Sequence, residues 1–395
     1  MKTFKSLALL GMIMPVMMLA TEPTNAELYE MFKQLEHKLD VAIADGNKAK
    51  AEAALAKKEA ASAKAELARL KKGYTMQPVV AATESTTTVA SKTPVSVHIE
   101  PLMLRTTRNG LDYAILDINN NGEPEGNIIS VNPGYDIGVR LGANYEIGSG
   151  KDIFADLATL KVKHSSSVST EISNNLWGIW LHPNAIIDDN DVDEASAAYD
   201  LDYMVFDLGM SKRFGLGKGL GARLKGGLRY AKINQTFDID YVQHVTSTLD
   251  RIADVHIDNK FKGFGPRIGL DMDWDMGHGF GLFGSVTGSL LTGDFKLGMQ
   301  EIDTTEGGPT TTRVDIAETS KHRMIPVVDM RLGLGYIYPI NEDMIFTASV
   351  GYEWQNWSNM VSARRFNDDV DDQISSTETN NLAFDGFFFR SELKF

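Results

Sequence analysis

The strongest constraint on this chain is a two-residue alternation of apolar and polar side chains that begins at Ser96 and continues to Phe395. A period of two places successive side chains on opposite faces of a β-strand. Residues 264–274 show the pattern clearly, with an apolar face of Phe264, Pro266, Ile268, Leu270, Met272 and Trp274. The other face carries charges and glycines. A series of such strands, each longer than the usual five or six residues, favours a membrane β-barrel over a soluble sandwich.

The pattern predicts about ten strands joined by two kinds of connection. We expect strands at 96–105, 134–148, 152–164, 199–213, 219–233, 258–275, 279–293, 322–338, 343–360 and 382–395. Short turns near 148–151, 214–219, 275–279 and 339–342 alternate with long polar loops at 106–133, 165–198, 234–257, 294–321 and 361–381. Short turns at one rim and long loops at the other are typical of an outer membrane barrel. An even number of strands also returns both ends of the barrel to the periplasmic rim.

The first residues predict export. Residues 1–26 combine Lys2 and Lys5 with an apolar stretch from Leu7 to Ala20 and small residues before a cleavage site at Ala26. This is the layout of a secretory signal peptide, and a short membrane anchor is the alternative. The chain has no cysteine, which suits an oxidising periplasm and excludes disulfide scaffolds and thiol nucleophiles.

Residues 27–72 predict a periplasmic coiled-coil helix. Apolar residues alternate at spacings of four and three, from Leu28, Phe32 and Leu35 to Leu67 and Leu70. Because the middle of this seam is almost all alanine, it buries little apolar area and should associate weakly alone. It could oligomerise barrels, with a trimer favoured, or act as a spacer or peptidoglycan contact, or remain a lone solvated helix. Residues 73–95 are rich in Thr, Ser and Ala and predict a linker, so the barrel domain is 96–395.

Charge limits the choice of partners. The chain carries 39 Lys and Arg against 53 Asp and Glu, a net charge of −14, which argues against a nucleic-acid partner. Inside a barrel, however, both signs are expected, because a charge on the lipid face costs about 2–4 kcal/mol near the midplane. The strand phases predict fourteen lumen-facing residues as pore-lining candidates. They are Asp136, Glu146, Asp207, Asp271, Asp273, Asp329, Glu353, Arg140, Arg223, Lys225, Arg229, Arg267, Arg331 and Arg390. Such walls could line a water channel or pair across the lumen and plug it.

The last strand has the features of an assembly signal. Phe387, Phe389, Ser391, Leu393 and Phe395 share one face, and Phe395 is the final residue. This resembles the signal that the barrel-assembly machinery reads in outer membrane proteins.

Several segments resemble the Legionella-type major outer membrane protein family. They are residues 261–295, with FGPRIGLD and SLLTG, together with 327–339, 350–360 and 382–395. The resemblance implies a pore-forming barrel of the Gram-negative outer membrane with a porin-like or surface-structural role, and it supplies no catalytic residue. The expected partners are outer membrane lipid and lipopolysaccharide, and no cofactor is expected. The function expected is therefore a porin-like channel for small solutes or ions. The alternative is a plugged structural or surface-exposed barrel, such as an adhesin or cell-wall tether.

Weaker signals lie in the predicted outer loops. Asp117, Asn119 and Asn121 match the start of a calcium loop, but Ile128 stands where a bidentate Glu is needed, so a turn is the better interpretation. Two acidic clusters, at 188–194 and 368–372, could bridge to lipopolysaccharide through divalent ions, although simple solvation is favoured. An outer-rim protease would use Asp and His residues. The histidines in or beside these loops are His164, His182, His244, His256 and His322. None has a spacing that identifies a catalytic pair, so no enzyme is expected.

Overall fold

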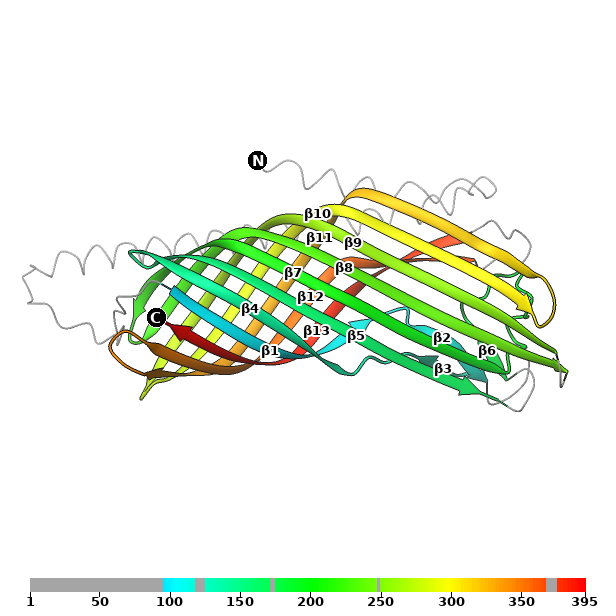
Figure 1. Cartoon of the computed structure of the whole chain (residues 1–395), viewed down its shortest axis with the longest axis horizontal. Coiled ribbons are helices and arrows are strands. Elements are labelled where there is room, and N and C mark those ends of the chain that lie inside the picture. The colour runs from blue at the N-terminus through cyan, green and yellow to red at the C-terminus, as the bar shows by residue number, and fades with distance from the viewer. Residues whose placement is uncertain (1–94, 118–124, 171–174, 247–248, 367–374) are drawn as a thin grey trace, which may run out of the picture. The chain divides into compact units, whose positions relative to one another are not determined.

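The computed structural model describes residues 95–117, 125–170, 175–246, 249–366 and 375–395 (Figure 1). The predicted signal peptide and coiled coil, and all but the last residue of the predicted linker, lie outside this part of the chain. Among the described residues there is no helix with the length and hydropathy needed to cross a membrane.

Ten antiparallel strands form a closed barrel in the ring order β1, β13, β12, β11, β10, β9, β8, β7, β5, β4. The barrel closes between β1 and β13, where Val95 and Phe395 exchange backbone hydrogen bonds of 2.9 and 3.3 Å. The strands are β1 (Val95–Arg108), β4 (Tyr135–Gly148), β5 (Lys151–Ser169), β7 (Glu194–Gly217), β8 (Leu220–Thr246), β9 (Leu249–Gly277), β10 (Phe280–Thr305), β11 (Thr310–Pro339), β12 (Ile345–Phe366) and β13 (Ser375–Lys394). The predicted number of strands is therefore confirmed.

Three of the short turns repeat one local design. Each is a Gly-X-Gly sequence centred on Ser149, Lys218 or His278, and all three residues of each turn have positive φ. Glycine is favoured at such positions because it lacks the Cβ that makes this backbone region costly. These turns lie at the same end of the barrel as the start of β1 and the C-terminus (Figure 1).

Next to the short turns, the outward-facing side chains of the barrel form an apolar band. On β9 it runs from Phe264 to Met276, with 63% of Phe264, 64% of Ile268 and 50% of Trp274 exposed. Twelve residues of strand span about 40 Å, or about 28 Å along the axis at a tilt of about 45°, which matches the hydrocarbon thickness of a membrane. Other strands continue the band with exposed aromatic residues: Tyr145, Tyr230, Tyr336, Tyr338, Tyr352 and Trp354. We call this part of the barrel the membrane section.

Beyond the band, the strands continue where the sequence predicted long loops. Residues 234–257 are expected to form a loop, but within this segment β8 continues to Thr246 and β9 begins at Leu249. Residues 294–321 likewise form a hairpin of β10 and β11. The loop prediction was wrong because the polarity of the two faces inverts. Here the inward face is apolar, including Phe237, Ile239 and Ile257 at 0% exposure, and the outward face is polar. We call this part the outer section.

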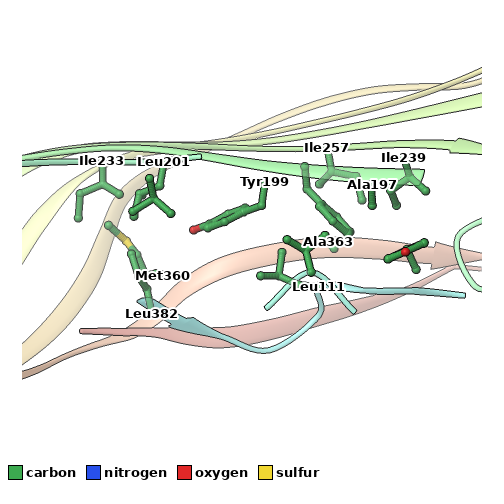
Figure 2. Close-up of a cluster of buried hydrophobic side chains, with 14 of the residues drawn as sticks. Leu111, Ala197, Tyr199, Leu201, Ile233, Ile239, Ile257, Met360, Ala363 and Leu382 are labelled. Carbon is green, nitrogen blue, oxygen red and sulfur yellow. The ribbon is translucent and has the colours of Figure 1, made fainter. Parts of the chain in front are cut away.

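In the outer section, two layers of strands pack on either side of an apolar core. Pairing between β11 and β12 runs from Val327–Trp357 to Pro339–Ile345, whereas β10–β11 and β12–β13 continue further outward. The walls of β7, β8 and β9 then face β12 and β13 across buried side chains such as Tyr199, Met360 and Leu382 (Figure 2). A small sheet of β2 (Asp112–Asp117), β3 (Gly126–Ser130) and β6 (Leu176–Gly178) packs against the same core.

Candidate functional site

The candidate site is the lumen of the membrane section. All fourteen residues predicted there lie on inward-facing positions of their strands, alternating with exposed apolar residues on the lipid face. Twelve of the fourteen form ion pairs with other described residues; Arg223 and Asp273, near the short turns, do not. The lumen charges are therefore largely neutralised inside the barrel itself.

The first cluster joins two carboxylates to two guanidinium groups. Arg140 on β4 contacts both Glu100 on β1 and, at 3.0 Å, Glu353 on β12. Arg331 on β11 lies 2.6 Å from Glu100 and 3.3 Å from Glu353. The side chains of Glu100 and Glu353 are 0% and 1% exposed. Buried charges of this kind are stable only when paired, so each arginine connects three strands from the inside.

A second cluster lies between β7, β8, β9 and β11. Asp207 binds Arg229 through two hydrogen bonds of 2.7 and 3.0 Å, and it also lies 2.8 Å from Arg267. Arg229 reaches on to Asp329 at 2.7 Å. Arg229 is on β8 and Asp329 is on β11. Because β9 and β10 lie between these two strands in the ring, the ion pair reaches across part of the lumen.

Smaller pairs surround the two clusters. Lys225 lies 2.6 Å from Asp271, Arg390 lies 2.6 Å from Glu392, Glu146 lies 2.9 Å from Lys394, and Asp136 lies 2.9 Å from His164. The pair of His98 and Asp156, at 3.1 Å, was missed because the phase of 152–164 is ambiguous in the sequence. Glu100 was also missed. The alternation of β1 does place it on the same face as Ser96 and His98, and that signal could have identified it.

An aromatic layer spans the lumen on the outer side of these clusters. Tyr203 on β7 packs edge to face against Trp357 on β12, with ring centroids 5.8 Å apart, and against Phe384 on β13 at 5.0 Å. The Tyr203 hydroxyl donates a hydrogen bond of 3.0 Å to Gln355. Strands β7 and β12 lie on opposite sides of the ring, so these contacts span the lumen. Below them, the ion-paired side chains line a cavity of about 60 Å³, which is room for a few water molecules.

Residues 179–187 cover the core at the far end of the outer section. Glu301 on β10 is 0% exposed and accepts the backbone N–H of His182 at 3.0 Å. Asp303, two residues further, accepts the N–H of Ile186 at 2.7 Å and binds Arg313 at 2.5 Å. Burial raises the pKa of Glu301 to about 8. The carboxyl groups of Glu301 and Asp303 therefore hold this covering segment by its backbone.

The weaker sequence signals lie only partly within the described residues. Residues 118–124 of the calcium-loop candidate and the cluster at 368–372 lie outside the described residues. In the other acidic cluster, Asp193 accepts the backbone N–H of His244 at 2.6 Å and Asp191 accepts a hydrogen bond from Gln243. Within the described part of the chain, no group of three His, Asp or Glu residues is arranged to hold a metal ion. His244 and His256 pair with carboxylates on the polar outer face of the outer section.

The chain matches one family of known proteins in sequence and is similar to several solved structures. A family model described as Legionella pneumophila major outer membrane protein precursor matches residues 88–395. Among solved structures, the chain is similar to the outer membrane protease OmpT from Escherichia coli, with 13% identity, a TM-score of 0.41, and coverage of 76% of this chain and 96% of that chain. It is also similar to a FadL homologue from Pseudomonas aeruginosa, with 9% identity, a TM-score of 0.23, and coverage of 77% and 90%.

A third similar structure is CarO from Acinetobacter baumannii, with 14% identity, a TM-score of 0.23, and coverage of 62% of this chain and 98% of that chain. No curated protein sequence matches the chain.

Proposed function

The chain belongs to the Legionella pneumophila major outer membrane protein family, and from that premise we propose that it is a closed, structural barrel of the outer membrane that carries a rigid surface-exposed outer section. This is the plugged barrel that the sequence left as the alternative to a porin-like channel. The geometry favours it over an open pore.

One observation carries the proposal, namely the contact of Tyr203 with Trp357 across the lumen. Trp357 is 0% exposed and Tyr203 is 6% exposed, so the aromatic layer leaves little free surface. In a water-filled pore, aromatic side chains at this level would be exposed to solvent. The ion-paired clusters beneath the layer occupy the next level of the lumen, around the cavity of about 60 Å³. Since protein interiors of this kind are close-packed, the barrel has the interior of a small structural barrel.

Planar-bilayer recording tests this proposal. Purified full-length protein, shown to be inserted by its heat-modifiable migration on gels, should give no steady single-channel current above the bare bilayer. The same recording on protein without residues 27–95 tests whether the N-terminal region influences the lumen. A reproducible ohmic current from the full-length protein would overturn the closed-barrel proposal.

The porin-like channel is the second candidate, and the polar lining of the lumen favours it. Arg223 and Asp273 make no ion pair among the described residues, and they lie near the short-turn rim. If the bilayer recording finds current, neutralising Arg223, Lys225 and Arg229 together should shift selectivity toward cations. The balance of acids and bases would then make the native pore weakly selective.

The remaining partners are also proposals. We expect the outer membrane lipid and lipopolysaccharide to surround the barrel, and the barrel-assembly machinery to insert it using the strand that ends at Phe395. Residues 27–72 would act in the periplasm, either by joining barrels into a homo-oligomer, with a trimer favoured, or by contacting peptidoglycan. The proposal includes no enzymatic activity and no cofactor.

A further inference from the structure

Lysines on the outward face of β8, β9 and β10 lie opposite one another on neighbouring strands, where like charges are unfavourable. Lys232 on β8 is directly opposite Lys262 on β9, and Lys260 on β9 is directly opposite Lys296 on β10. Like charges placed directly opposite each other destabilise a sheet. Two such pairs, side by side on adjacent strands, form a concentration of positive charge on a chain whose net charge is −14.

Three of these four lysines lack the internal partners that neutralise lysines elsewhere on the outer wall. On β5, Lys161 lies 3.6 Å from Asp202 and Lys163 lies 3.2 Å from Asp200. Lys260 is paired along its own strand with Asp258 at 2.6 Å. By contrast, Lys232, Lys262 and Lys296 have no carboxylate within ion-pair distance among the described residues. The nearby Asp294 is opposite Lys262 in the register but forms no ion pair with it.

The position of these lysines along the barrel axis indicates which part of the membrane surrounds them. Directly below the pair of Lys232 and Lys262, in the same register, Tyr230 is opposite Phe264. Both aromatic residues are exposed and mark the outer limit of the apolar band. Two residues further along each strand, the lysines therefore lie at the level of the headgroups, where aromatic residues and cations meet the membrane surface.

From this arrangement we infer that Lys232, Lys262 and Lys296 form a binding site for the phosphorylated sugar headgroup of a membrane glycolipid, with Tyr230 and Phe264 against its acyl chains. A phosphate between the two opposed lysines turns their mutual repulsion into two charge-assisted contacts. This inference rests on the proposed placement of the barrel in the outer membrane. It adds a specific site, because general solvation by lipid does not require unpaired cations at one position on the wall.

The test compares a site variant with a matched control. K232Q/K262Q removes one opposed pair, whereas K161Q/K163Q removes two outward lysines that are already paired with aspartates on another part of the wall. Binding to the refolded full-length protein is measured with three probes: bisphosphorylated lipid A, the same lipid with its phosphates removed, and inorganic phosphate alone. Heat-modifiable migration confirms that each protein is folded.

The native protein and K161Q/K163Q should prefer bisphosphorylated over dephosphorylated lipid A. K232Q/K262Q should lose about 25-fold in affinity for the phosphorylated lipid, at about five-fold for each lysine near an anionic surface. K232R/K262R, which keeps both charges, should retain binding. Equal affinity of K232Q/K262Q and native protein overturns the site, as does equal binding of the two lipids by the native protein. Saturable binding of inorganic phosphate that fully competes with the lipid would replace the glycolipid by a free anion. A failure here leaves the bilayer recordings unaffected, so the closed-barrel proposal is judged separately.

Discussion

Tyr203 and Trp357 meet edge to face in the middle of the barrel, although they come from strands on opposite sides of the ring. The contact joins two walls that share no backbone hydrogen bonds. It also separates the ion-paired lumen of the membrane section from the apolar core of the outer section.

Removing this contact should open the lumen. The double variant Y203A/W357A takes two large side chains from a filled cross-section, and the loss of Trp357 alone should cost about 3–5 kcal/mol of unfolding free energy. We expect single-channel current in planar bilayers from the variant and none from the native protein. W354A is the matched control, because Trp354 is on the same strand but faces lipid. A folded Y203A/W357A barrel that stays silent would show that the ion pairs close the lumen unaided.

Breaking the first ion-paired cluster should destabilise the membrane section. E353A leaves Arg140 and Arg331 with one carboxylate between them, and the loss of one partner from a buried pair costs about 3–5 kcal/mol. Urea unfolding in lipid vesicles measures this loss. Glu342, an exposed residue in a short turn, supplies the control E342A, which should change the free energy by less than about 0.5 kcal/mol. Comparable stability of the two variants would show that Glu353 is not needed to hold these arginines.

The covering segment 179–187 should respond to pH through Glu301. The folded-state pKa of Glu301 is about 8, above its ordinary value of 4.5, because the carboxyl is buried. A raised folded pKa gives a stabilising contribution that is complete below about pH 4.5 and is lost as pH rises through about 8. Amide hydrogen exchange at His182 should therefore become faster, relative to E301Q, between pH 5 and pH 9.

The comparison with E301Q is needed because Asp303, Arg313 and His182 also carry titratable groups near this segment. E306Q, at an exposed position on the same hairpin, should behave like the native protein. The same pH profile in native protein and E301Q would contradict a role for Glu301.

Replacing Phe395 should impair assembly. Its backbone closes the ring against Val95, and its side chain is 41% exposed on the lipid face. F395K places a charge at that position and should lower the fraction of heat-modifiable barrel in membranes, whereas F395Y should preserve it. Full assembly of F395K would rule out a signal at this residue.

The N-terminal region should affect association more than folding. Deleting residues 27–72 should leave a folded barrel, because strand pairing and lipid contact hold residues 96–395 independently. Tethering in one membrane raises the effective concentration of weakly associating helices, so the deletion should weaken cross-linked oligomer bands. If the bands are unchanged, loss of co-sedimentation with peptidoglycan becomes the measurement that assigns the region.

Local pattern was enough to predict the ten-stranded ring. The alternation at Pro266–Trp274 fixed the lipid-facing side of β9, and the same reasoning placed Arg229 and Glu353 inside. The contacts of those side chains were not predictable, because which strands meet across a lumen depends on the shear and tilt of the whole ring. The outer section was missed for a different reason. Phe237 and Ile257 follow the same alternation as the membrane section, but there the apolar side chains face inward.

The inversion of polarity between the two sections limits how such a chain can change length. On β9 the two patterns share one phase, so a single residue inserted between Phe261 and Phe264 would turn one section inside out. Only paired insertions, matched on the neighbouring strands, preserve both faces. This restriction does not apply to β11 and β12. The pairing of β10 with β11 shifts register near His322, and that of β12 with β13 shifts near Asn359; both residues have positive φ. Over evolutionary time, the outer section should therefore grow or shrink in even steps along β8 and β9, and more freely along β11 and β12.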